Sequence, residues 1–208
     1  MNRTRVKICG ITRTEDALAA AHAGADAIGL VFFAGSPRAI TLARAAALCA
    51  ALPPFISKVG LFVNAPAEEV QAVTKNLSLD LLQFHGEESP EFCAQFKQPF
   101  IKAVRVKPGM DLVQYASLFK LAQGLLLDAF HESAPGGTGI TFDWNLIPTE
   151  LELPIILSGG LNANNVAAAI GRVNPWAVDV SSGVEEAKGI KNAAKMAAFI
   201  TEVRRADI

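Results

Sequence analysis

Short apolar segments alternate with alanine-rich or amphipathic segments along this chain, and this alternation limits its possible folds more than any other feature. The apolar runs predict eight strands, at Val6–Cys9, Asp26–Phe33, Ser57–Val63, Leu79–Phe84, Phe100–Val106, Gly124–Ala129, Pro154–Leu157 and Ala177–Val180. The intervening segments predict helices at Thr14–His22, Leu42–Leu52, Ala67–Asn76, Pro90–Phe96, Asp111–Leu121, Ala163–Arg172 and Asn192–Val203, with only a short helical turn within Phe142–Ile147. Strands that alternate with helices run parallel and are joined by right-handed crossovers.

Two architectures accommodate eight such units, a closed barrel and an open doubly wound sheet. The length of 208 residues suits one compact barrel and is short for two domains. No G-x-G-x-x-G run opens the first helix, as it would in an open sheet that binds a dinucleotide. We therefore predict a single α/β domain over residues 1–208, folded as a (β/α)8 TIM barrel.

Charge and cysteine content exclude several classes of partner and site. A formal net charge of −1 provides no long-range field for nucleic acid or an acidic membrane, so neither is an expected partner. No segment is long enough to span a bilayer, and the first apolar run is too short for a secretory signal. The odd, widely spaced cysteines, Cys9, Cys49 and Cys93, argue against a disulfide framework and favour a reducing cytoplasm. No His, Asp and Cys set has metal-ligand spacing, so no metal is expected.

In a barrel, reacting groups lie at the carboxyl ends of the strands. Two glycine-containing loops follow the last two predicted strands, Gly159-Gly160 and Ser182-Gly183. Glycine lets backbone N–H groups approach an anion, and barrels often hold a phosphate at these two loops. The alternative is that both are simple turns, but their joint position favours a phosphate site.

Two residues at the predicted rim have side chains suited to proton transfer. Asp128 ends an apolar strand and is either a general acid or an acid bonded within the rim. Cys9 ends the first strand, with Lys7 two residues back on the same face. A cysteine in such a run is either a small buried apolar residue or, as thiolate, a nucleophile or base.

Two further rim residues are candidates for binding. Arg38, in the loop after the second strand, is either a forked carboxylate ligand or a solvated loop residue. His85 ends the fourth strand, where it either shuttles protons or only bonds a neighbouring loop.

Short motifs follow the predicted strands through the whole chain. They are Lys7-Ile8-Cys9-Gly10-Ile11-Thr12, Phe32 to Arg38 ending Ser36-Pro37-Arg38, Val59-Gly60-Leu61-Phe62-Val63-Asn64, Gln83-Phe84-His85-Gly86, Leu127-Asp128, Gly136-Gly137-Thr138-Gly139 with Phe142-Asp143-Trp144, Ser158-Gly159-Gly160-Leu161, and Asp179-Val180-Ser181-Ser182-Gly183-Val184-Glu185. Each is short, but in this order they are highly specific. The chain resembles the phosphoribosylanthranilate isomerases of tryptophan biosynthesis.

The resemblance implies an aldose–ketose isomerase without a cofactor, acting on a small sugar phosphate. N-(5-phosphoribosyl)anthranilate would undergo an Amadori rearrangement to 1-(2-carboxyphenylamino)-1-deoxyribulose 5-phosphate. By the same resemblance, Asp128 is the general acid at the furanose oxygen and Cys9 the general base at C2. Arg38 would hold the anthranilate carboxylate, the glycine loops the phosphate, and Asp179 the sugar hydroxyls or the amine.

Departures from the family pattern, at Phe84, Ile140 and Ala187-Lys188-Gly189, do not touch the expected acid, base or arginine. A rival enzyme is an indole-glycerol-phosphate synthase, which would need a catalytic lysine such as Lys102. Another is a bifunctional sugar isomerase, although the chain has no half-barrel symmetry. A barrel that only binds a phosphorylated metabolite is a rival of another class. The sequence leaves monomer and homodimer open, with Phe55, Phe130 and Trp144 as possible contacts.

Overall fold

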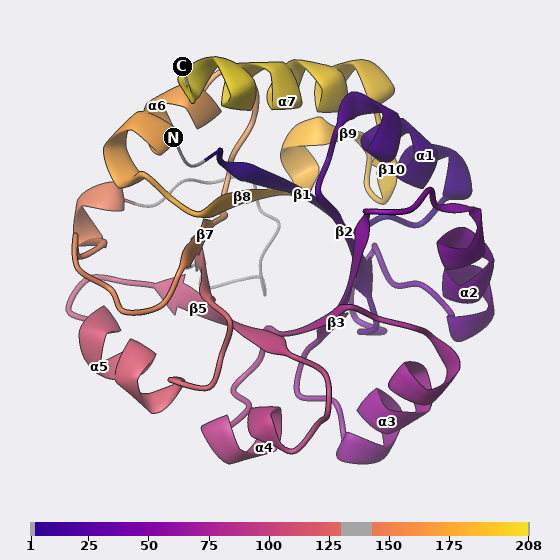
Figure 1. Ribbon diagram of the computed structural model, residues 1–208, viewed down its shortest axis with the longest axis horizontal. Helices are drawn as coiled ribbons and strands as arrows, with labels where there is room; N and C mark the ends of the chain where they lie inside the picture. The colour runs from indigo at the N-terminus through magenta and orange to yellow at the C-terminus, as the bar shows by residue number, and fades with distance from the viewer. Residues whose placement is uncertain (1–2, 130–142, 208) are drawn as a thin grey trace.

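The structure, a computed structural model, describes residues 3–129 and 143–207. Eight parallel strands close into a barrel in the order of the chain. Figure 1 looks down this barrel and shows the strands as an inner ring. The strands are β1 (Arg5–Cys9), β2 (Ala27–Val31), β3 (Ser57–Phe62), β4 (Leu81–Phe84), β5 (Phe100–Val106), β6 (Leu125–Ala129), β7 (Ile155–Leu157) and β8 (Ala177–Val180). The predicted TIM barrel is confirmed.

Helices surround the barrel on the outside (Figure 1). They are α1 (Thr14–Ala23), α2 (Leu42–Ala51), α3 (Ala67–Asn76), α4 (Pro90–Ala94), α5 (Leu112–Leu118), α6 (Val166–Val173) and α7 (Ala193–Ala206). In the described part of the connection from β6 to β7 there is only a 3-10 turn, η1 (Trp144–Leu146), as the sequence predicts. No helix within the described ranges combines the length and the apolar character that crossing a bilayer requires.

Helix α6 begins three residues later than its predicted start at Ala163. Asn165 Oδ1 accepts from the amide of Asn162 at 2.8 Å, and Asn162 Oδ1 accepts from the amide of Asn164 at 2.9 Å. Such side-chain bonds offer the backbone an alternative to the helical ladder. These bonds hold residues 162–165 in a turn, so α6 begins only at Val166.

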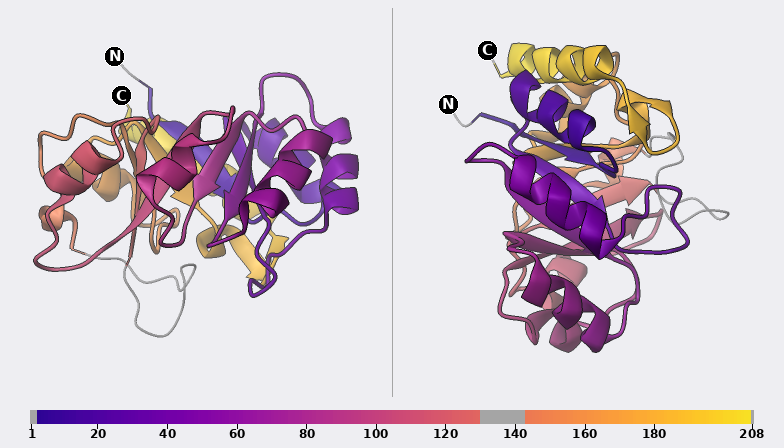
Figure 2. Two further views of the ribbon diagram at one scale, coloured as in Figure 1. Left: turned by 90° about the horizontal axis from the view of Figure 1, so that it is seen from below. Right: turned by 90° about the vertical axis from the view of Figure 1, so that its right-hand side faces the viewer.

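A short antiparallel hairpin after β8 is absent from the sequence prediction. It pairs β9 (Glu185–Ala187) with β10 (Ile190–Lys191) after the 3-10 turn η2 (Ser182–Val184). Thr12 Oγ1 donates to the carbonyl of Gly189 at 2.5 Å, which ties the hairpin to the loop after β1. Figure 2 shows the hairpin at the end of the barrel opposite the two termini. Strands of three and two residues are too short for periodicity to reveal.

Side chains pack on both faces of the barrel wall. Those that face outward form one large cluster with the helices, to which Val6 and Ile8 belong. Inside, a second cluster consists of Ile101, Ala103, Leu126, Ile156 and Ala177. A third joins Cys9, Val31 and Leu61 from the first three strands. The alternation of faces along β1 therefore directs Lys7 and Cys9 into the barrel.

A buried ion pair outside the barrel wall holds the loop after β4. Lys102 Nζ lies 3.1 Å from Glu88 Oε2 and donates to the carbonyl of Gly86 at 2.5 Å. It also lies 5.8 Å from the centre of the Phe119 ring on the helix side. Glu88 Oε1 accepts from the amide of Asn64 at 2.8 Å. Lys102 thus anchors loops from the outer side of the wall and does not face the barrel interior.

We predict that Lys102→Met lowers the free energy of unfolding by about 3–5 kcal/mol, because Glu88 would keep a buried charge without its cation. Denaturant unfolding measures this loss. Lys97→Met is the control, since Lys97 is exposed and its replacement should change the free energy by less than about 0.5 kcal/mol. Equal losses in the two variants would contradict a stabilising role for the pair.

Candidate active site

The buried pair of Lys7 and Asp179 lies at the seam where the barrel closes. The register places Lys7 opposite Asp179 on β8, and Lys7 Nζ lies 2.8 Å from Asp179 Oδ1. Asp179 Oδ2 also accepts from Ser158 Oγ at 3.4 Å, at the end of β7. Cys9 is on the same inward face, one step closer to the carboxyl end. The structure therefore brings two predicted site residues, Cys9 and Asp179, to one wall of the barrel.

Gly29 makes the space that the Cys9 thiol occupies. It pairs with Cys9 in the register of β1 and β2. A Cβ at this position would lie 2.8 Å from Cys9 Sγ and 3.2 Å from Lys7 Cε. The sequence analysis missed this residue, although an isolated glycine inside a predicted strand is a signal of close approach.

Burial is the strongest influence on the Cys9 thiol and raises its pKa. The positive charges of Lys7 and Lys191 act to lower the pKa, while Asp179 acts to raise it. The result is a pKa above that of an ordinary cysteine. Burial also acts to lower the pKa of Lys7, but the Asp179 and Cys9 charges outweigh it and raise that pKa. Lys7 is consequently an ammonium group whose nearest charge partner is Asp179.

Asp128 and His85 meet on the opposite part of the rim. Asp128 is the last residue but one of β6, and its Oδ1 accepts from the amide of Ala129 at 2.9 Å. His85 Nε2 lies 3.3 Å from Asp128 Oδ2. On the other side of the ring, Gln83 Nε2 lies 3.0 Å from His85 Nδ1. The ring of His85 thus faces Gln83 with one nitrogen and Asp128 with the other.

The two glycine loops pack directly against each other. A Cβ at Gly183 would lie 2.0 Å from the carbonyl oxygen of Leu161. Gly159 and Gly160 both have positive φ, of 86° and 65°. Among the residues the structure describes, the amides of Gly159 and Gly160 donate to no acceptor. These N–H groups are thus available to an anion beside Ser182 and Gly183 in η2.

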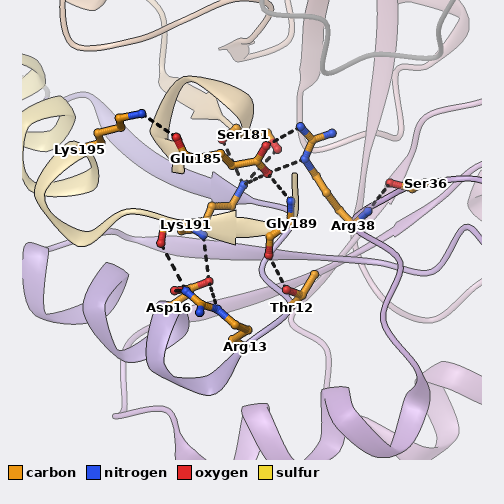
Figure 3. A network of polar contacts seen from close by, with 10 residues as sticks. All are labelled: Thr12, Arg13, Asp16, Ser36, Arg38, Ser181, Glu185, Gly189, Lys191 and Lys195. Atoms are coloured by element: carbon orange, nitrogen blue, oxygen red, sulfur yellow. Dashed lines mark hydrogen bonds and ion pairs between the residues drawn. The ribbon is translucent and has the colours of Figure 1, made fainter. Parts of the chain in front are cut away.

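Arg38 takes part in a buried network with the β9–β10 hairpin (Figure 3). Its Nε lies 2.7 Å from Glu185 Oε1, and its Nη2 lies 2.8 Å from Glu185 Oε2. Lys191 Nζ donates to Glu185 Oε1 at 2.9 Å. Burial acts to raise the pKa of Glu185, but the bonds and charges of Arg38 and Lys191 hold it below its usual value. The sequence analysis identified Arg38 but neither of these partners.

Several residues from the sequence analysis lie away from this rim or outside the described residues. Cys49 and Cys93 belong to α2 and α4, and burial raises the pKa of Cys93 to about 12. Phe130, Ile140 and the Gly136–Gly139 motif lie outside the described residues. Across residues 3–129 and 143–207, no three His, Cys, Asp or Glu side chains form a cluster that could hold a metal ion.

Comparison with known proteins places this arrangement in a family. Residues 6–202 match the family model for N-(5'-phosphoribosyl)anthranilate (PRA) isomerase. An N-(5'-phosphoribosyl)anthranilate isomerase from Nitrosospira multiformis is 60% identical over 199 residues, which cover 96% of each chain.

Solved structures agree with this match. One, of monomers derived from the dimeric phosphoribosylanthranilate isomerase of Thermotoga maritima, has a TM-score of 0.86 and 38% identity, and the match covers 97% of this chain and 99% of that one. Another is a phosphoribosylanthranilate isomerase in complex with reduced 1-(o-carboxyphenylamino)-1-deoxyribulose 5-phosphate, with a TM-score of 0.83, 37% identity and the same coverage. The chain belongs to the N-(5'-phosphoribosyl)anthranilate isomerase family.

Proposed function

We propose that this chain isomerises N-(5'-phosphoribosyl)anthranilate to 1-(2-carboxyphenylamino)-1-deoxyribulose 5-phosphate, a step of tryptophan biosynthesis. One observation carries the proposal: a buried thiol, Cys9, and a carboxyl group, Asp128, lie at the ends of two strands of the same barrel rim. On the same rim, the glycine loops after β7 and β8 offer amides to a phosphate, and Arg38, after β2, offers a cation to a carboxylate. The product analogue bound to a solved relative has both of these groups.

In the first step, Asp128 acts as general acid. Its carboxyl proton goes to the furanose ring oxygen, and the C1–O bond breaks with its electron pair on that oxygen. The lone pair of the anthranilate nitrogen forms the second bond of a C1=N iminium. His85, 3.3 Å from the carboxylate, is placed to stabilise the anion that Asp128 becomes.

In the second step, Cys9 acts as general base. The thiolate takes the proton from C2, the C–H pair forms a C1=C2 bond, and the iminium π pair returns to nitrogen. The enolamine then tautomerises to the ketone. The iminium charge stabilises a nearby thiolate, so the thiol releases its proton to solvent most readily when the cationic intermediate is present.

The remaining residues bind the substrate. Arg38 binds the anthranilate carboxylate through a fork of N–H groups, and the Gly159-Gly160 and Ser182-Gly183 loops bind the phosphate. Asp179 contacts the sugar hydroxyls or the amine, and its bonds to Lys7 and Ser158 support a fixed position for this role. Lys102, which an indole-glycerol-phosphate synthase would need in its site, is bound outside the wall.

The chain acts in the cytoplasm as a monomer or a homodimer. Cys9, Cys49 and Cys93 are all free, which suits a reducing compartment. Phe55 is 98% exposed and itself lines a surface pocket, together with apolar residues such as Leu52 and polar ones such as Lys58 and Asp80. An exposed aromatic ring supports a contact between two copies, and the Thermotoga relative is described as dimeric. Trp144 is partly buried against the core and offers less surface.

We predict that Cys9→Ser and Asp128→Asn each lower kcat by about 10²–10⁴-fold, because each removes one proton-transfer group. The fluorescence decay of freshly generated phosphoribosylanthranilate measures turnover. Cys49→Ser, in α2, is the matched control and should keep wild-type rates. Binding without turnover by the wild type would favour a metabolite-binding barrel, whereas full activity in both site variants would refute the assignment of acid and base.

The thiol pKa gives a second prediction. Because burial raises the pKa of Cys9, its thiolate fraction at neutral pH is smaller than that of a free cysteine. In a Cys49→Ala/Cys93→Ala background, the rate of Cys9 alkylation should rise with pH with a midpoint above about 8.5. Mass spectrometry after timed exposure to iodoacetamide gives the rates. A midpoint at or below the ordinary value would show that Lys7 outweighs burial.

The packing of the glycine loops gives a third prediction. Gly183→Ala should raise KM by about tenfold or more, because a Cβ 2.0 Å from the Leu161 carbonyl forces the two phosphate-binding loops apart. Gly171→Ala is the control, since a Cβ there meets nothing within 4 Å. Steady-state kinetics on both variants gives KM. An unchanged KM in Gly183→Ala would argue against phosphate binding at these loops.

A further inference from the structure

Glu185 binds the same arginine that the proposed function assigns to the substrate. Its two carboxylate oxygens accept from Arg38 Nε at 2.7 Å and Nη2 at 2.8 Å. Figure 3 shows Glu185 between Arg38 on one side and Lys191 on the other. The two partners are 147 residues apart in the chain and meet only because the β9–β10 hairpin folds over the rim.

We propose that Glu185 is a positioning residue that fixes the orientation of the Arg38 guanidinium and so determines how strongly the protein selects ligands that carry a carboxylate. The inference rests on the proposed function, in which Arg38 receives the anthranilate carboxylate.

The geometry of the guanidinium supports this role. The group has five N–H donors in one plane. Glu185 takes the edge formed by Nε and Nη2, and Nη1 has no partner among the described residues. One Nη2 proton and both Nη1 protons remain. The second edge of the plane, formed by Nη1 and Nη2, is therefore free to bind a ligand carboxylate in the forked mode.

The stem of Arg38 is fixed as well as its head. A Cβ at Gly10 would lie 2.5 Å from Arg38 Cδ, so the stem packs against the backbone directly after Cys9. Only 11% of the Arg38 side chain is exposed. Because both the methylene chain and the guanidinium of Arg38 are held, the Nη1–Nη2 edge points in one direction. Little conformational entropy is therefore lost when a ligand binds there.

The charges of the network distinguish positioning from simple attraction. Arg38 and Lys191 carry two positive charges and Glu185 one negative charge, which leaves one positive charge. Burial lowers the pKa of Lys191, while Glu185 acts to raise it. Without Glu185, Lys191 therefore loses its proton more readily. Glu185→Gln therefore changes the charges of the network as well as the orientation of Arg38, and Glu185→Asp, which keeps the negative charge, separates the two effects.

The test compares two ligands by isothermal titration calorimetry. One is reduced 1-(2-carboxyphenylamino)-1-deoxyribulose 5-phosphate, and the other is the same compound with a phenyl ring that has no carboxylate. The Kd of the carboxylate-free ligand divided by the Kd of the carboxylate ligand measures how much the carboxylate contributes to binding. Arg38→Met gives the ratio without the guanidinium. We expect Glu185→Gln to lower the wild-type ratio by about tenfold, with the carboxylate-free ligand bound as in the wild type.

Two further variants separate positioning from a general disturbance of the hairpin. Lys195→Met is the control, because Lys195 Nζ donates to the main-chain oxygen of Glu185 at 2.7 Å and not to its carboxylate. Its ratio should equal that of the wild type. Glu185→Asp keeps the charge beside Lys191 but is one methylene shorter, so it should also lower the ratio. This second variant keeps the test decisive if Glu185→Gln does not fold.

Three results would overturn the inference. A wild-type ratio in both Glu185 variants, together with a lowered ratio in Arg38→Met, would leave the role of Arg38 standing and reduce Glu185 to a structural residue. An equal rise in the Kd of both ligands in the Glu185 variants would mean that the substitutions disturb the whole rim and not Arg38 alone. An unchanged ratio in Arg38→Met would instead refute the proposed binding role of Arg38 itself.

Discussion

The buried ion pair between Lys7 and Asp179 is the interaction on which the rest of the rim depends. It joins β1 to β8, the strands that close the barrel, with 2.8 Å between Nζ and Oδ1. Two charges removed from water are costly to bury unless they are paired and hydrogen-bonded, so this pair strongly disfavours any shift in the register of the closing strands. On the other side of β1, the register with β2 sets Cys9 opposite Gly29 and gives the thiol its space. Strand β1 therefore takes part both in the closure of the barrel and in the placement of Cys9, the proposed base.

A second ionic group, Arg38–Glu185–Lys191, lies at the edge of the same rim. Both groups combine charges of opposite sign in places with little water, and the whole chain has a formal charge of only −1. In the proposed function, the protein thus presents positive charge to the carboxylate and the phosphate of its substrate through a few fixed donors instead of a broad field. Fixed donors select by geometry, which a long-range field does not do.

The sequence predicts what depends on local pattern. The strand periodicity gives all eight barrel strands, and the rule that barrels carry their chemistry at strand ends points to Cys9 and Asp128. Local sequence pattern does not predict partners that meet only in the folded chain. Glu185 and Arg38, which are 147 residues apart, are an example. The hairpin that carries Glu185 and Lys191 has strands too short to show a period. Helix α6 is predicted too early because asparagine side chains replace its first helical bonds.

The Lys7–Asp179 pair also explains why a buried thiol suits the base in the proposed mechanism. Lys7 is the cation nearest to Cys9, yet its charge is largely balanced by Asp179, so it does not create a permanent thiolate. Burial keeps the free thiol protonated and therefore less open to oxidation and alkylation. A cationic iminium at C1 adds a positive charge that Asp179 does not balance, and this charge favours the thiolate at the moment when C2 must lose its proton. In the proposed mechanism the substrate thus supplies the charge that activates its own base.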